Sequence, residues 1–178
     1  DESENLSPAA ENALHAALSD SLPEMTVKDV RELLETTEKG QTKSCVTNAE
    51  TILSYDPLLK EAIRFNELTQ RVDIVKDVGW ERRDGAGLVD NDLHNIHLYC
   101  ERTYGVSSLN LIDEAVHIVA NRNAYHPVRD FLNSLVWDGK PRVRYALRRF
   151  LGADDSDYTY EILKFFMLGA ISRVFRLG

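Results

Sequence analysis

The sequence has few of the residues from which covalent frameworks are built. Its 178 residues include only two cysteines, Cys45 and Cys100, which are too few for a disulfide framework. Unpaired thiols fit a reducing compartment, so we expect a cytoplasmic protein. No run of 18 apolar residues and no charged-then-apolar leader occurs, and we therefore expect neither a membrane span nor secretion.

Motifs of known catalytic chemistry are also missing. The sequence contains no G-x-x-x-x-G-K-[ST] phosphate-binding loop, no G-x-S-x-G nucleophile turn and no H-E-x-x-H zinc helix. Gly85 and Gly87 do not open a helix in a G-x-G-x-x-G pattern, which argues against a dinucleotide loop. We therefore expect no catalytic residue and no cofactor in this chain.

Two groups of side chains could suggest a metal site. His94 and His97 are spaced to share one, but Cys100 lies six positions after His94 and points about 120° away on a helix. The acidic cluster at 154–157 precedes a predicted helix, where carboxylates complement the positive end of the helix dipole. A structural role fits both groups better, so we predict no metal site.

The net charge is −8, but it is unevenly distributed. Residues 1–90 carry 19 acidic and 10 basic side chains, whereas residues 91–178 carry 10 and 11. Residues 140–149 contain no acidic side chain and five basic ones, Lys140, Arg142, Arg144, Arg148 and Arg149. An acidic chain argues against general nucleic-acid binding, yet a local basic stretch can still contact phosphates.

The sequence predicts a mainly α-helical fold with a minor β component. We expect an acidic helical lead-in or linker over residues 1–43, with helices after Ser7 and after Thr26, and a helical domain over residues 44–178. Within that domain, alternation of apolar and polar residues predicts a β-hairpin at 63–75.

Two predicted helices with Gly105 between them outline a helix-turn-helix-like unit, which the hairpin could extend into a winged helix. Asp90 or Asn91 is placed to cap the first helix. The second helix carries Asp113 and Glu114 where a recognition helix would carry basic or amide side chains. These carboxylates would repel phosphates, so we do not expect this unit to read bases.

The rest of the chain is organised around residues 125–142. Pro127 fixes its own φ and keeps His126 out of the helical region, so a helix is predicted to begin at Pro127. An apolar stripe follows, formed by Val128, Phe131, Leu132 and Leu135. Asp138 and Gly139 then form a turn. We predict that Trp137 anchors the core and that His126 and Arg129 hold the turn together.

This segment, HPVRDFL-x3-VWDGKPR, is followed by a Leu-Gly stop, Asp154-Asp155, Tyr158-Thr159 and a long apolar helix. In these features the chain, from about residue 45 onward, resembles the virulence-associated E family. That family contains replication proteins of phages, prophages and mobile islands, similar to primase–helicases with a P-loop ATPase. The resemblance implies that residues 171–176 lie just before the ATPase domain, and that ATP and Mg²⁺ would bind there rather than in this chain.

A helix beginning near Pro141 would carry the five basic residues. Arg144 and Arg148 would be neighbours on an exposed strip, suited to contacting a DNA backbone without reading sequence. The opposite side would be buried and formed by Val143, Leu147, Phe150 and Leu151. A merely solvated basic helix face is the alternative.

The last predicted helix, about 157–176, is apolar around most of its circumference. Such a helix must be buried or covered by a partner, so we expect self-association or packing against the ATPase domain. The function we expect is that of a non-catalytic part of a mobile-element replication protein, which contacts single-stranded or forked DNA or assembles the helicase motor. The alternative is a protein–protein adaptor that oligomerises or binds a replication partner without contacting DNA.

Overall fold

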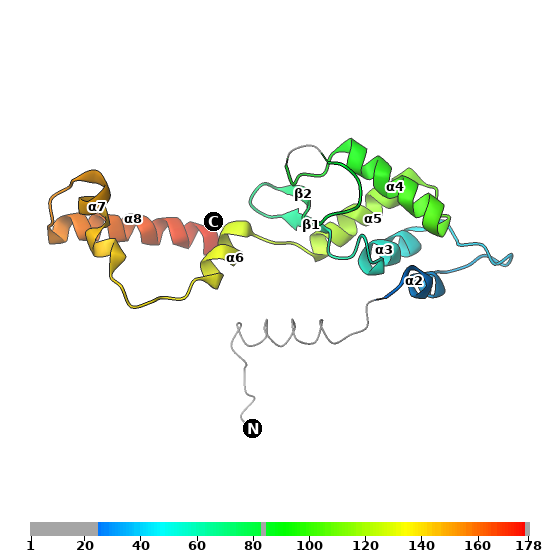
Figure 1. Cartoon of the computed structure of the whole chain (residues 1–178), viewed down its shortest axis with the longest axis horizontal. Coiled ribbons are helices and arrows are strands. Elements are labelled where there is room, and N and C mark those ends of the chain that lie inside the picture. Colours follow the sequence, from blue (N-terminus) through cyan, green and yellow to red (C-terminus); the bar gives the residue numbers. More distant parts are fainter. Residues whose placement is uncertain (1–24, 83–84, 177–178) are drawn as a thin grey trace, which may run out of the picture. The chain divides into compact units, whose positions relative to one another are not determined.

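The computed structural model of the chain describes residues 25–82 and 85–176 (Figure 1). Over these residues it is mainly helical with one two-stranded antiparallel hairpin, which confirms the predicted fold class. The helix predicted after Ser7 lies outside the described residues. The chain divides into two compact units, one formed by residues up to 65 with 71–124, the other by 66–70 with 125–178. The predicted boundary near residue 43 is distinct from this division and stays a prediction.

The first unit contains four described helices and the strands of the hairpin. They are α2 (Val27–Leu33), α3 (Val46–Tyr55), α4 (Asp90–Tyr104), α5 (Leu109–Arg122), β1 (Ile63–Asn66) and β2 (Arg71–Ile74). Helix α5 packs against both α3 and α4. The helix-turn-helix-like succession of α4 and α5 is therefore present, whereas its completion into a winged helix stays a prediction.

Local side-chain chemistry sets where these helices begin and end. Thr26 caps α2 as predicted, and the Asp29 carboxylate accepts a 2.7 Å hydrogen bond from the Thr26 backbone N–H. Gly105 ends α4 with a φ of +79°, a conformation that glycine adopts without steric cost. The predicted cap of α4 was wrong by one or two residues, because Val89 holds the cap position and Asp92 accepts its N–H at 3.2 Å.

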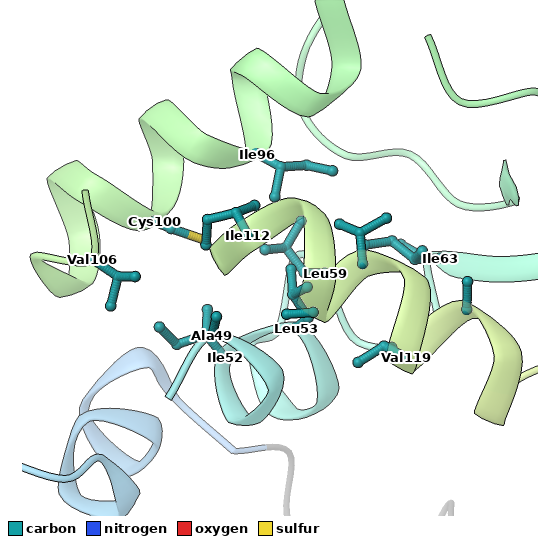
Figure 2. Packing of buried hydrophobic residues seen from close by; sticks show 14 of the residues in the cluster. Ala49, Ile52, Leu53, Leu59, Ile63, Ile96, Cys100, Val106, Ile112 and Val119 are labelled. Atoms are coloured by element: carbon teal, nitrogen blue, oxygen red, sulfur yellow. The ribbon is translucent and has the colours of Figure 1, made fainter. Parts of the chain in front are cut away.

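The core of the first unit lies where α3, α4 and α5 meet (Figure 2). Ile52 and Leu53 of α3, Ile96 of α4 and Ile112 of α5 have no exposed surface. Helix α2 adds Val30 to the same cluster, which ties that helix to the unit. Each such side chain contributes about 1.5–3 kcal/mol on burial, so this cluster is the main source of stability.

The second unit has a different character. Its helices are α6 (Pro127–Ser134), α7 (Arg142–Leu151) and α8 (Asp157–Phe175). Both α6 and α7 contact α8, yet none of the three helices contains a buried residue. A helix that packs against one or two neighbours only, without a further layer, leaves most of its side chains exposed. The predicted buried side of α7 was therefore wrong. Phe150 and Leu151 are 74% and 76% exposed, and Val143 and Leu147 are not buried either.

Candidate nucleic-acid interface

The start of α6 is fixed by the residues predicted to hold it. Pro127 occupies the first turn, and the Nδ1 atom of the buried His126 accepts a 3.2 Å hydrogen bond from the Arg129 backbone N–H. The Arg129 guanidinium pairs with Glu67 at 3.1 Å and donates to the Val174 carbonyl at 3.3 Å. These contacts connect α6 to the hairpin turn and to the end of α8.

The turn before α7 is held by Asp138. Its carboxylate accepts two 2.6 Å hydrogen bonds from the Arg142 guanidinium and one of 3.2 Å from the Lys140 backbone N–H. The hydrogen bonds from Arg142 lower the pKa of Asp138 to about 2, so the carboxylate stays ionised at neutral pH. Gly139 takes a φ of +80°, which completes the turn.

The prediction that Trp137 anchors a core was wrong. Its side chain is 79% exposed, and its indole N–H donates a long 3.4 Å hydrogen bond to the Lys140 carbonyl. The physical reason is that no described element packs over the turn between α6 and α7. Trp137 therefore belongs to the surface that precedes α7.

Two of the five basic residues face the start of α8 rather than solvent alone. Arg144 donates to Asp157 at 2.6 Å, and Arg148 donates to Asp155 at 2.9 Å. The Arg144 guanidinium also lies 5.2 Å from the ring centroid of Tyr160. Fewer exposed cations are therefore free of an ion pair than the sequence predicted, because Arg144 and Arg148 hold α7 against α8.

Lys140 and Arg149 are the remaining members of the basic group. Over residues 25–82 and 85–176, neither side chain has an ion pair. Arg149 lies 5.6 Å from the ring centroid of Phe150, a contact that leaves its charge uncompensated. These two cations are the ones available to an anion.

The sides of α7 consequently differ. At 100° per residue, the side chains that hold the helix to α8 lie on one side, and those that line a surface groove of about 390 Å³ lie on the other. We call the second set the basic–aromatic face; it consists of Lys140, Pro141, Arg142, Tyr145, Ala146, Arg149 and Phe150. Sequence reasoning missed Tyr145 and Phe150. Their spacing from Arg149 on a helix was the signal that could have identified them.

Two polar networks in the first unit also escaped sequence reasoning. Arg82 pairs with the buried Asp92 at 3.0 Å and donates to three backbone carbonyls, one at the end of β2 and two in the loop that follows. Trp80 donates its indole N–H to the same carboxylate. Burial raises the pKa of Asp92, but hydrogen bonds from Arg82 and Trp80 outweigh this and the pKa is lowered. The network anchors the loop between β2 and α4.

The second network surrounds Asp56, which has no exposed surface. Tyr99 and Tyr104 donate their hydroxyls to it at 2.9 and 2.6 Å. Burial, followed by the hydrogen bond to Asp56, raises the pKa of both tyrosines. Burial likewise raises the pKa of the Cys100 thiol to about 12, so this thiol is not a nucleophile at neutral pH.

The histidines of α4 are engaged separately. His94 Nδ1 lies 2.6 Å from the Asp90 carbonyl, and His97 Nε2 lies 2.8 Å from the Ser107 carbonyl. Among the described residues, no three His, Cys, Asp or Glu side chains come together in a way that could hold a metal ion. In the same part of the chain, no helix has the length and apolarity needed to cross a membrane.

The comparison with protein families places a match on the second unit. Residues 132–178 match the model of the virulence-associated protein E-like domain. The match confirms the resemblance and covers the turn before α7, α7 and α8, which include the basic–aromatic face. No curated protein matches the sequence.

Proposed function

We propose, from the virulence-associated protein E-like domain at residues 132–178, that the chain is a non-catalytic part of a mobile-element DNA replication protein and that α7 contacts the DNA backbone. ATP and Mg²⁺ would act in the P-loop ATPase domain of such a protein, outside this sequence. We further propose a cytoplasmic location, which the two free cysteines support.

The observation that carries the proposal is the pair of uncompensated cations on the basic–aromatic face, one in the turn before α7 and one on α7. Lys140 and Arg149 lie on one face, whereas three other basic side chains of the segment are paired with carboxylates. DNA binds more favourably to cations without an ion pair, because no existing salt bridge has to be broken. The chain as a whole is acidic, so attraction to DNA would be local to this face.

The test is binding of labelled single-stranded and forked DNA to the full chain by fluorescence anisotropy at a series of salt concentrations. We expect Lys140→Gln/Arg149→Gln to weaken binding and to reduce the slope of log K against log[salt] by about 1.4, because each lost phosphate contact on a single strand removes about 0.7. Lys28→Gln/Lys39→Gln is the matched control, with the same change in charge on an exposed part of the first unit.

Substitution of Arg144 or Arg148 would be a poor test. These side chains hold α7 to α8, so a loss of binding would not separate contact with DNA from disruption of the helix pair. No binding of any DNA by the folded chain at low salt would refute the proposal. Equal losses in the test and control variants would also refute it, because they would show a general effect of charge.

A protein–protein adaptor is the second candidate, and α8 is the observation that favours it. Phe165, Phe166 and Leu168 are 81%, 71% and 56% exposed, and an apolar groove of about 780 Å³ runs along this helix. Sedimentation velocity between about 1 and 100 μM would test this candidate. A concentration-dependent increase in mass that Phe165→Ser abolishes would support it, and a monomer throughout would oppose self-association.

A further inference from the structure

We infer that the basic–aromatic face selects single-stranded nucleic acid, with Tyr145 and Phe150 stacking on bases while Lys140 and Arg149 contact phosphates. This inference rests on the proposed function and narrows its ligand. The binding residues inferred here differ from the strip of arginines that the sequence predicted, which was led by Arg144 and Arg148. It also assigns a role to two aromatic rings that a backbone-only contact leaves unused.

Both aromatic rings of the basic–aromatic face are exposed. Tyr145 is 51% exposed and Phe150 is 74% exposed. A single exposed aromatic side chain is common on protein surfaces. Here both line the same groove as two cations without ion pairs, and the combination of charge with exposed rings distinguishes this face from an ordinary apolar patch.

The rings and the arginine between them follow one another along α7. Tyr145 and Arg149 are four residues apart and Phe150 follows directly, so rings and charge alternate over an arc of roughly 140°. At 1.5 Å per residue the two rings are separated by about 7.5 Å along the helix axis, which is room for two separate bases. Successive nucleotides of one strand could therefore meet a ring, a charge and a second ring.

Exposed rings favour a single strand over a duplex as the ligand of this face. In a duplex the faces of the bases are stacked on one another, so only the backbone is open to this face and the rings gain nothing. In a single strand each base presents a π-face, and stacking on an aromatic side chain contributes about 1–3 kcal/mol per base. Two phosphate contacts alone are few for a duplex-binding surface, whereas two contacts combined with two stacked bases form a coherent single-strand site.

Arg142 does not alter this assignment. It lies in the groove, but both ends of its guanidinium fork are bound to Asp138 at 2.6 Å. The pairing leaves it as a positioning residue that shapes the edge of the groove. Arg142 therefore offers no free guanidinium fork for bidentate recognition of guanine, and Arg149 is the arginine of the face that remains available to a phosphate.

The experiment compares three probes of matched length on the full chain at low salt: an oligothymidine strand, a strand of abasic nucleotides and a duplex. The abasic strand keeps the phosphates and removes the bases. We expect oligothymidine to bind at least tenfold more tightly than the other two. Tyr145→Leu/Phe150→Leu keeps apolar bulk and removes the rings, so it should erase that preference.

Phe131→Leu is the matched control, since Phe131 is 61% exposed on α6 and lies outside the basic–aromatic face. It should leave the preference unchanged. Equal binding of all three probes, unaffected by loss of the rings, would overturn the single-strand inference while the proposed backbone contact stands. Absence of binding to every probe would overturn both.

Discussion

Removing the Tyr104 hydroxyl should destabilise the first unit by about 2 kcal/mol. Tyr104 is 3% exposed and donates a 2.6 Å hydrogen bond to Asp56, which is fully buried. Hydrogen bonds to charged groups contribute about 1.5–3 kcal/mol, and Tyr104→Phe deletes one while the ring continues to fill its place. Asp56 would keep the hydroxyl of Tyr99 and the amides of Leu58 and Leu59 as donors.

The assay is urea unfolding followed by the fluorescence of Trp80, in a Trp137→Phe background that removes the other indole. With a slope of about 1–2 kcal/mol per molar urea, the midpoint should fall by about 1–2 M. Tyr55→Phe is the control, because Tyr55 is 47% exposed and should change stability by less than about 0.5 kcal/mol. A loss in Tyr104→Phe no larger than in the control would refute the reasoning.

The same pair of tyrosines predicts a loss of stability in alkali. Burial and hydrogen bonding to Asp56 raise the pKa of Tyr99 and Tyr104 above the value that they have in the unfolded chain. The stability that they contribute is therefore present below about pH 10 and is lost as pH rises toward the folded pKa, because the unfolded state releases its protons first. Tyr104→Phe should make the alkaline decline shallower, and an unchanged decline would contradict the assignment.

Four further predictions concern the first unit and the start of α6. Arg82→Leu should destabilise by about 3–5 kcal/mol in urea unfolding, because it leaves the Asp92 carboxylate buried and unpaired. The pKa of Asp92 is lowered in the folded protein, so the stability that its carboxylate contributes is present above about pH 4 and is lost as the pH falls through the folded pKa. Asp92→Asn should therefore reduce the loss of folding stability at acid pH. Gly105→Ala should lower the free energy of unfolding by about 1–2 kcal/mol, because alanine is strained at a φ of +79°. The added Cβ meets no atom within 4 Å, so this backbone strain should be the whole effect seen in urea unfolding. His126→Ala should lower the helical circular dichroism signal and cost about 1 kcal/mol through loss of the α6 cap, and no change would show that the cap is dispensable.

The local features of the fold could be predicted because they depend on neighbours in sequence. The hairpin within 63–75, the cap at Thr26, the stop at Gly105 and the start at Pro127 follow from turn chemistry and backbone restriction. The partners of Arg144 and Arg148 could not be predicted in this way. Pairing with Asp157 and Asp155 requires α8 to fold back along α7, and helical periodicity does not encode that contact.

The same reasoning explains the error at Trp137. A tryptophan at the end of an apolar stripe usually marks a core, but burial depends on whether another element covers it. The stripe of α6 and the apolar residues of α7 and α8 meet too few opposing surfaces to bury one another. The composition of a helix indicates how much apolar area is available, and only the tertiary arrangement decides how much of it is covered.

The second unit is discontinuous in sequence, and this determines where the protein can be cut. Residues 66–70 belong to it, although the rest of β1 and all of β2 belong to the first unit. A fragment that begins at residue 132, where the family match begins, would lose Arg129 and the start of α6. A fragment that begins at Tyr125 would keep both but would lose the Glu67 carboxylate that pairs with Arg129. It would also lose the Glu67 N–H that donates to the Tyr125 carbonyl at 2.9 Å. Fragments intended to carry α6, α7 and α8 should therefore retain the hairpin.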